Sequence, residues 1–121
     1  MEHIRKGLVW MGQSRKNLCE FPDDVRQVMG YALDVAQCGG KHPDAKPLRG
    51  FSGAGVLEIV EDFDGDTYRT VYTVKLKHAV YVLHAFQKKS TKGIETPKPD
   101  IDLIKSRLNA AKQHHDAHKW E

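Results

Sequence analysis

Three strand-like segments follow one another between residues 55 and 86, and their short connections limit the folds that the chain can adopt. They read GVLEIVED (55–62), DGDTYRTVYTVK (64–75) and HAVYVLHAF (78–86). β-Branched and aromatic residues are frequent in them, as is typical of pleated strands. Antiparallel neighbours need only tight turns, whereas parallel neighbours need long crossovers, so the segments predict an antiparallel meander. HAVYVLHAF is the most apolar of the three and is predicted to be central.

Helical patterns precede and follow the predicted meander. Within 21–40 one apolar stripe recurs at helical spacing, comprising Val25, Val28, Met29, Ala32, Val35 and Ala36. A shorter helix is predicted before it, capped by Ser14, and a strand is predicted at 8–11. A last helix is predicted to be capped by Thr96 and to open at Pro97. The segment 41–54 is rich in proline, glycine and lysine and is predicted to be a loop.

The predicted order is therefore strand, two helices, three antiparallel strands and helix. This order is an α+β fold, with the helices laid against one side of a small sheet. The opposite face, or a groove at one end of it, would then be left for a ligand or partner. With 121 residues the chain has the size of one domain. We expect residues 1–121 to form a single domain whose polar tail frays from about residue 112.

The composition is that of an ordinary globular protein, with 40% hydrophobic and 29% charged residues. The first residues, MEHIRKGLVWMG, contain no long apolar run, so neither an export signal nor a membrane span is expected. Cys19 and Cys38 have no metal-like spacing and are expected to be reduced thiols. These features are typical of a cytoplasmic protein without a membrane partner.

The distribution of charge is more informative than the net charge of +3. Cations gather in two stretches, 41–50 with Lys41, Lys46 and Arg49, and 87–92 with Lys88, Lys89 and Lys92. The acidic residues gather elsewhere, in EFPDD and EIVEDFDGD. Such separation indicates a side of the protein that faces a polyanion.

Two residues interrupt strand patterns that otherwise favour burial. Arg69 is either a strand-edge arginine on a solvated face, paired with an acid such as Glu58 or Asp66, or a fixed guanidinium that binds a phosphate. His84 is either a hydrogen-bonded core histidine or a general acid or base. We expect Val80, Val82, His84, Phe86 and Lys88 to share one face of their strand. Phe86 on that face is a core residue or a platform on which an RNA base stacks.

Lys88 and Lys89 form either a solvated strand end or, with Arg69, one cationic cluster at an end of the sheet. His114 and His118 have the i, i+4 spacing of a metal pair, but no nearby cysteine completes a site, and an exposed polar tail is the alternative. The chain has no Walker loop, GxGxxG, CxxC or GxSxG motif. We therefore expect no cofactor and no metal.

Three long segments resemble the phage-derived, HigB-like branch of the RelE/ParE toxin superfamily. They are RKNLCEFPDDVRQVMGYAL, AKPLRGFSGAGVLEIVEDFDGDTYRTVYTV and VYVLHAFQKKSTKGIETPKPDIDLIKSRL, and the likeness runs from about Val9 to Leu108. TYRTVYTV and LHAFQKKSTKGIETP are the most specific pieces. The resemblance implies a compact α+β toxin with a twisted antiparallel sheet. It further implies a metal-free endoribonuclease that cuts mRNA in the ribosomal A site by attack of a 2′-hydroxyl on the adjacent phosphate. A cognate helix-turn-helix antitoxin is the implied partner.

The resemblance also implies roles for individual residues. Arg69 matches the strand arginine that contacts the scissile phosphate, and Lys88 and Lys89 match a cluster that supplies phosphate contacts and proton transfer. Lys46 falls where relatives place a catalytic polar residue. The further expected residues are His84 for catalysis, and Arg49, Phe86 and Lys92 for RNA binding. The codon-stacking C-terminal tyrosine of some relatives has no match here.

Two other functions remain open. ParE-like members of the superfamily share the fold and inhibit DNA gyrase through protein contacts, without nuclease activity. An inactive phage remnant would keep only the binding of its antitoxin or operator. The retained Arg69 and the Lys88–Lys89 pair favour the endoribonuclease.

Overall fold

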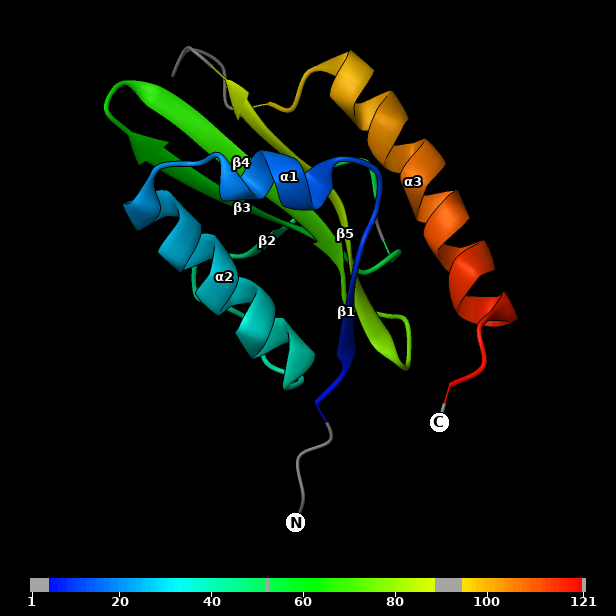
Figure 1. Ribbon diagram of the computed structural model, residues 1–121. Helices are drawn as coiled ribbons and strands as arrows, with labels where there is room; N and C mark the ends of the chain where they lie inside the picture. The colour runs from blue at the N-terminus through cyan, green and yellow to red at the C-terminus, as the bar shows by residue number, and fades with distance from the viewer. Residues whose placement is uncertain (1–4, 52, 89–94, 121) are drawn as a thin grey trace.

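The structure is a computed structural model that describes residues 5–51, 53–88 and 95–120. Its elements run in the order β1 (Gly7–Trp10), α1 (Ser14–Cys19), α2 (Asp23–Gln37), β2 (Lys46–Pro47), β3 (Val56–Phe63), β4 (Asp66–Thr73), β5 (Ala79–Lys88) and α3 (Lys98–Ala117) (Figure 1). The predicted α+β class and the predicted order of the main elements are confirmed. No helix in the described ranges is long and apolar enough to cross a membrane.

The sheet has the strand order β1-β5-β4-β3-β2. The meander β3–β4–β5 is antiparallel and β5 lies between two neighbours, as predicted. β1, however, pairs with β5 in parallel, with Leu8 opposite Val80, so the sheet is mixed rather than wholly antiparallel. The parallel pairing is possible because two helices and the meander connect the two strands. The predicted loop 41–54 contains the short edge strand β2, in which Lys46 pairs with Glu58.

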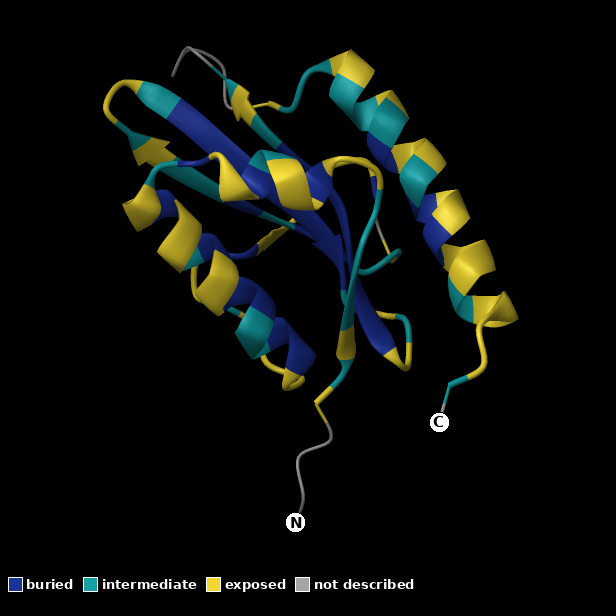
Figure 2. Cartoon of the chain, viewed as in Figure 1, coloured by how far each residue is buried: buried dark blue, intermediate teal, exposed yellow. Residues whose placement is uncertain are grey.

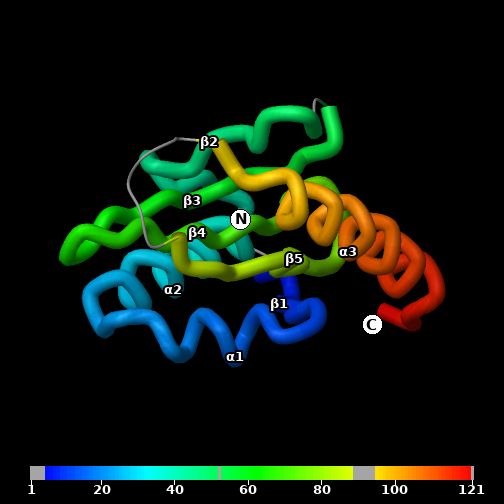
Figure 3. Tube along the Cα trace, turned by 90° about the horizontal axis from the view of Figure 1, so that it is seen from above, coloured from blue at the N-terminus to red at the C-terminus, as the bar shows by residue number. Residues whose placement is uncertain are grey.

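Helices cover both faces of the sheet, which corrects the prediction that they share one side (Figures 1 and 3). α1 and α2 bury Leu18, Val25, Met29, Ala32 and Leu33 against one face. On the other face α3 contributes to a separate core with Leu48, Phe51, Val71, Tyr81, Leu83, Ile104, Leu108 and Ala111. Figure 2 shows α2 and α3 with a buried stripe toward the strands and an exposed stripe outward. The stripe of α3 packs on this second face because β3, β4 and β5 each also present apolar side chains there, among them Val56, Val71 and Leu83.

A β-bulge in β5 determines which side chains face α3. Val71 pairs with His84 but Tyr72 pairs with Val82, so Leu83 is the extra residue. Such an insertion reverses the alternation of side chains along a strand. The prediction of a single face is therefore wrong for Val80 and Val82.

The bulge separates the two parts of β5. Val80 and Val82 belong to the core under α1 and α2. His84 contacts Asp100 of α3, and Phe86 pairs with Arg69 and stacks on His84. Lys88 pairs with Thr67, which lies two residues before Arg69, and Lys88 itself lies two residues after Phe86, so it follows Phe86 on the α3 face.

Two predicted caps have other roles. The Ser14 hydroxyl is fully buried and donates to the carbonyl of Val82 (3.3 Å), so it ties α1 to β5 instead of capping the helix. The hydroxyl of Thr96 does not cap α3, whose N-terminal boundary is Pro97. It contacts Arg69 and Glu58 instead. The hydroxyls of Ser14 and Thr96 thus connect their segments to strands that are distant in the sequence.

The C-terminal segment is ordered beyond the residue at which fraying was predicted. α3 continues to Ala117, and the Tyr81 hydroxyl lies 2.6 Å from Nδ1 of His114. The backbone N–H of His78 donates to Nε2 of His115 (3.1 Å), and the Trp120 indole donates to the carbonyl of His115 (2.9 Å). The prediction failed because aromatic rings hold this polar segment on the turn before β5. Within the described residues no cluster of three or more potential ligands could hold a metal.

Gly12 lies where the turn after β1 approaches α3. Its φ is +54°, a left-handed conformation that glycine adopts without strain. A Cβ atom at this position would overlap the guanidinium of Arg107. Arg107 in turn donates through Nη1 to the carbonyl of Leu83 (2.8 Å), which holds α3 on the bulge. A side chain at residue 12 would therefore disturb the docking of α3.

Gly12→Ala should lower the free energy of unfolding by about 2–3 kcal/mol, because it combines a left-handed backbone with displacement of Arg107. Gly39→Ala is the matched control, since Gly39 has a φ of +87° but no atom within 4 Å of the point that a Cβ would occupy. The control should cost about 1 kcal/mol. Urea denaturation of both variants measures the difference, and equal losses would contradict the role given to Arg107.

Candidate functional site

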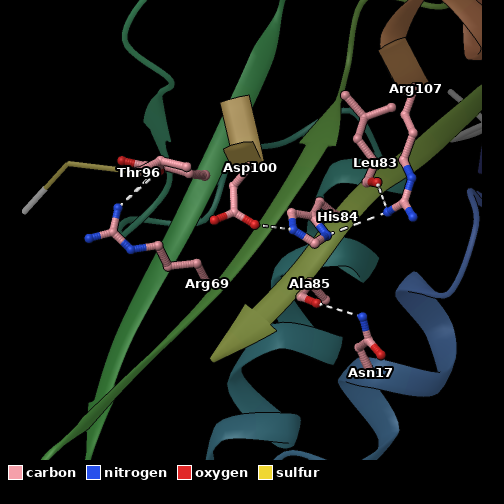
Figure 4. A network of polar contacts seen from close by, with 9 residues as sticks. Asn17, Arg69, Leu83, His84, Ala85, Thr96, Asp100 and Arg107 are labelled. Atoms are coloured by element: carbon pink, nitrogen blue, oxygen red, sulfur yellow. Dashed lines mark hydrogen bonds and ion pairs between the residues drawn. The ribbon is translucent and has the colours of Figure 1, made fainter. Parts of the chain in front are cut away.

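Arg69 lies on the α3 face of β4 with only 2% of its surface exposed. Its Nη1 donates to the Thr96 hydroxyl (3.1 Å; Figure 4). The same nitrogen lies 3.6 Å from Oε2 of Glu58. A guanidinium stays charged under all physiological conditions, so its burial requires polar partners and an opposite charge. Of the two acids predicted as partners, Glu58 forms the ion pair, but the arginine is buried rather than solvated.

Glu58 carries the negative charge that faces Arg69 in this site. From the sequence it is predicted only as an ion-pair partner, not as a functional residue. It lies on β3 opposite Val71 and, on its other side, opposite Lys46 of β2. Burial raises the pKa of the Glu58 carboxyl, and the charge of Arg69, the Thr96 hydroxyl and the charge of Lys46 oppose this shift. The signal in the sequence was a carboxylate inside the apolar run VLEIV.

A cavity of about 520 Å³ opens beside Glu58, the ion-pair partner of Arg69. Its lining residues are Lys46, Pro47, Leu48, Arg49, Glu58, Glu95, Thr96 and Ile101. Arg49 and Glu95 form an exposed ion pair at the cavity (2.9 Å). Two predicted cations, Lys46 and Arg49, thus line one cavity whose wall includes Glu58 and Thr96, the residues that hold Nη1 of Arg69. Among the described residues, the charged side chains that line the cavity are two cations, Lys46 and Arg49, and two carboxylates, Glu58 and Glu95, whereas Arg69 is buried and is not itself a lining residue.

The structure describes only part of the predicted cluster of Arg69, Lys88 and Lys89. Lys88 follows Phe86 on the Arg69 side of the sheet but is not among the described residues that line the cavity. Lys89 and Lys92 lie outside the described residues. The convergence of Lys88 and Lys89 with Arg69, and the RNA contact of Lys92, therefore stay predictions.

His84 joins β5 to α3 through both nitrogens of its ring (Figure 4). Nε2 lies 2.7 Å from Oδ1 of Asp100, and Nδ1 lies 3.4 Å from Nη1 of Arg107. Because an arginine can only donate, Nδ1 is the acceptor and Nε2–H donates to Asp100. This geometry favours the core interpretation of His84.

Phe86 is half-buried, and its ring stacks on the imidazole of His84, with centroids 4.6 Å apart. One face of the ring is therefore already covered within the protein. The predicted role as a stacking platform for RNA would use the remaining accessible part of the ring.

Comparison with known protein families gives a match over residues 16–109 to the family described as "Phage derived protein Gp49-like (DUF891)". The chain belongs to this family. The matched range of the Gp49-like chain contains Lys46, Glu58, Arg69 and Thr96 and ends before the histidines of the C-terminal segment.

No curated protein matches this Gp49-like chain. Among solved structures, it is similar to a chain of the toxin–antitoxin complex RelBE2 from Mycobacterium tuberculosis. The TM-score is 0.45 at 20% sequence identity, and the superposition covers 74% of this chain and 98% of the other.

Protonation of His84 should lower the stability of the Gp49-like chain in mild acid. Burial lowers the pKa of His84, Asp100 opposes the shift and Arg107 adds to it. The unfolded chain therefore binds protons more readily than the folded chain, so stability is present above the ordinary histidine pKa of about 6.5 and is lost below it.

Urea denaturation at about pH 7.5 and about pH 5.5 measures this loss in the wild type, in His84→Asn and in the control His118→Asn. The dependence on pH should be weaker in His84→Asn than in the wild type. It should persist in His118→Asn, because His118 is exposed. An unchanged dependence in His84→Asn would show that the titration of His84 is not coupled to folding.

Proposed function

We propose that the protein is the toxin of a type II toxin–antitoxin system and cleaves mRNA in the ribosomal A site. Membership of the phage-derived Gp49-like family and the sequence resemblance to the HigB-like branch of the RelE/ParE superfamily support this proposal. The observation that carries it is the buried, charged Arg69 beside a cavity lined by Lys46 and Arg49. A planar guanidinium and nearby ammonium groups are suited to phosphate oxygens.

In the proposed reaction the 2′-hydroxyl of one nucleotide attacks the adjacent phosphorus. Its proton passes to a base on the protein, the bond to the 5′-oxygen breaks, and that oxygen receives a proton. Arg69 and Lys46 would stabilise the additional negative charge on the phosphorane. Lys88 and Lys89 would contribute phosphate contacts and proton transfer. Arg49, Phe86 and Lys92 would hold the flanking RNA.

The phosphate would reach Arg69 from the cavity. Thr96 lines the cavity and accepts a hydrogen bond from the guanidinium, so a phosphate oxygen could replace the Thr96 hydroxyl as acceptor. A helix-turn-helix antitoxin is the proposed partner, and the cytoplasm, where ribosomes and mRNA meet, is the proposed location. Because the cations bind a polyanion, association with RNA should weaken with added salt.

Arg69→Ala should reduce RNA cleavage about 10²- to 10³-fold, the usual effect of removing one donor that stabilises a transition-state oxyanion. Induced expression followed by mapping of mRNA 5′ ends measures cleavage, and growth measures toxicity. Arg15→Ala, which removes an exposed arginine on α1, is the matched control and should leave both unchanged. Arg69→Lys keeps the charge without the forked geometry and should be intermediate.

Circular dichroism of each purified variant verifies that it is folded. Cleavage by folded Arg69→Ala at the wild-type rate would contradict the role of Arg69. Growth arrest with intact mRNA and altered DNA supercoiling would favour the gyrase inhibitor. A wild-type protein that binds its antitoxin but neither arrests growth nor cuts mRNA would favour the inactive remnant.

A further inference from the structure

We propose that Glu58 takes up a proton when an anion binds in the cavity beside Arg69, so that the carboxyl group controls the affinity of the site. The inference rests on the proposed function, in which this cavity receives an RNA phosphate. It assigns to Glu58 a regulatory role that is distinct from the phosphate contacts of the cations.

The position of Glu58 makes a conflict with a bound anion unavoidable. Its Oε2 accepts a hydrogen bond from the Thr96 hydroxyl (3.4 Å) and lies 3.6 Å from Nη1 of Arg69. The side chain is only 16% exposed and lines the cavity. A phosphate that contacts Arg69 from the cavity must therefore approach the carboxylate, and two anions at such a distance repel each other strongly where water is scarce.

Protonation of Glu58 would remove this conflict. A neutral carboxyl group no longer repels the phosphate and can donate its O–H to a phosphate oxygen. Burial already raises the pKa of Glu58 in the free protein, although Arg69, Thr96 and Lys46 oppose the shift. An anion that binds these cations cancels their influence on the carboxyl group. Binding should therefore raise the pKa of Glu58 further.

The surroundings of Glu58 contain charges of both signs. A second hollow on its other side, of about 390 Å³, is lined by Pro43, Asp44, Lys46, Glu58, Val60 and Glu61. The charged groups around the carboxyl are thus Lys46 from β2, Arg69 from β4, Arg49 and Glu95 across the first cavity, and Asp44 and Glu61 in the second. Among them, Arg69 lies within ion-pair distance of the carboxylate.

Glu95 provides the matched control, because it is a carboxylate at the same cavity with a different environment. Its side chain is 73% exposed, and it pairs with Arg49, whose side chain is 90% exposed. Water and salt screen such a pair. The contacts that join Arg69, Glu58 and Thr96 do not involve Glu95, so its replacement leaves them in place and should leave the proton linkage intact.

The test is binding of a 2′-O-methyl RNA trinucleotide, which cannot be cleaved and whose phosphodiesters do not titrate near neutrality. Wild-type affinity should rise as the pH falls from about 8 to about 5.5, approaching tenfold per pH unit at full uptake of one proton. Glu58→Gln should bind more tightly than the wild type at about pH 7.5 and lose most of this dependence. Glu95→Gln should keep it. Calorimetry in buffers of different ionisation enthalpy counts the protons taken up.

A second measurement needs no variant. Carbon-13 NMR of the wild-type carboxyl groups should show the pKa of Glu58 rising when the trinucleotide is added. Binding of the RNA with no proton uptake, or an identical pH profile in Glu58→Gln, would overturn the inference and leave the proposed function standing. RNA that binds neither the wild type nor either variant at any pH would overturn the inference, because it would leave no anion site in the cavity for Glu58 to control. The proposed function would instead be contradicted by mRNA that stays intact after induced expression of the wild type.

Discussion

A guanidinium buried in a sheet is the constraint on which the rest of the site depends. Arg69 cannot lose its charge, so the fold must bring it a negative partner and hydrogen-bond acceptors. Glu58 from β3 and Thr96 from the segment before α3 meet this need. The same contacts draw three parts of the chain together around a cavity lined by Lys46 and Arg49. In the proposed function an anion enters this cavity and replaces the partners of the arginine.

The docking of α3 is the second requirement of the site, since Thr96 stands just before this helix. The bulge at Leu83 turns His84 toward α3, where Asp100 and Arg107 bind its two nitrogens. Aromatic contacts hold the far end of the helix on the turn before β5. The helix is therefore anchored near both ends, and its position determines that of Thr96 at the cavity.

Much of the fold could be predicted from the sequence, because strand alternation, helical stripes and short turns are local signals. The meander and α2 are examples. The bulge left no signal, since residues 79–83 are apolar on both faces and either alternation fits them. The parallel pairing of β1 and the placement of α3 on the second face depend on long-range packing. In the site, the cations were predicted from their charge, whereas Glu58 required the pairing of β2, β3 and β4 to show that it faces Arg69.

The most direct test of the central claim is a crystal structure of the protein with an uncleavable 2′-O-methyl RNA. We predict a phosphate in the cavity, within hydrogen-bond distance of Arg69 and close to Lys46, with the Thr96 hydroxyl displaced from the guanidinium. An RNA bound on the α1–α2 face, with the contacts of Arg69 to Glu58 and Thr96 unchanged, would contradict the claim.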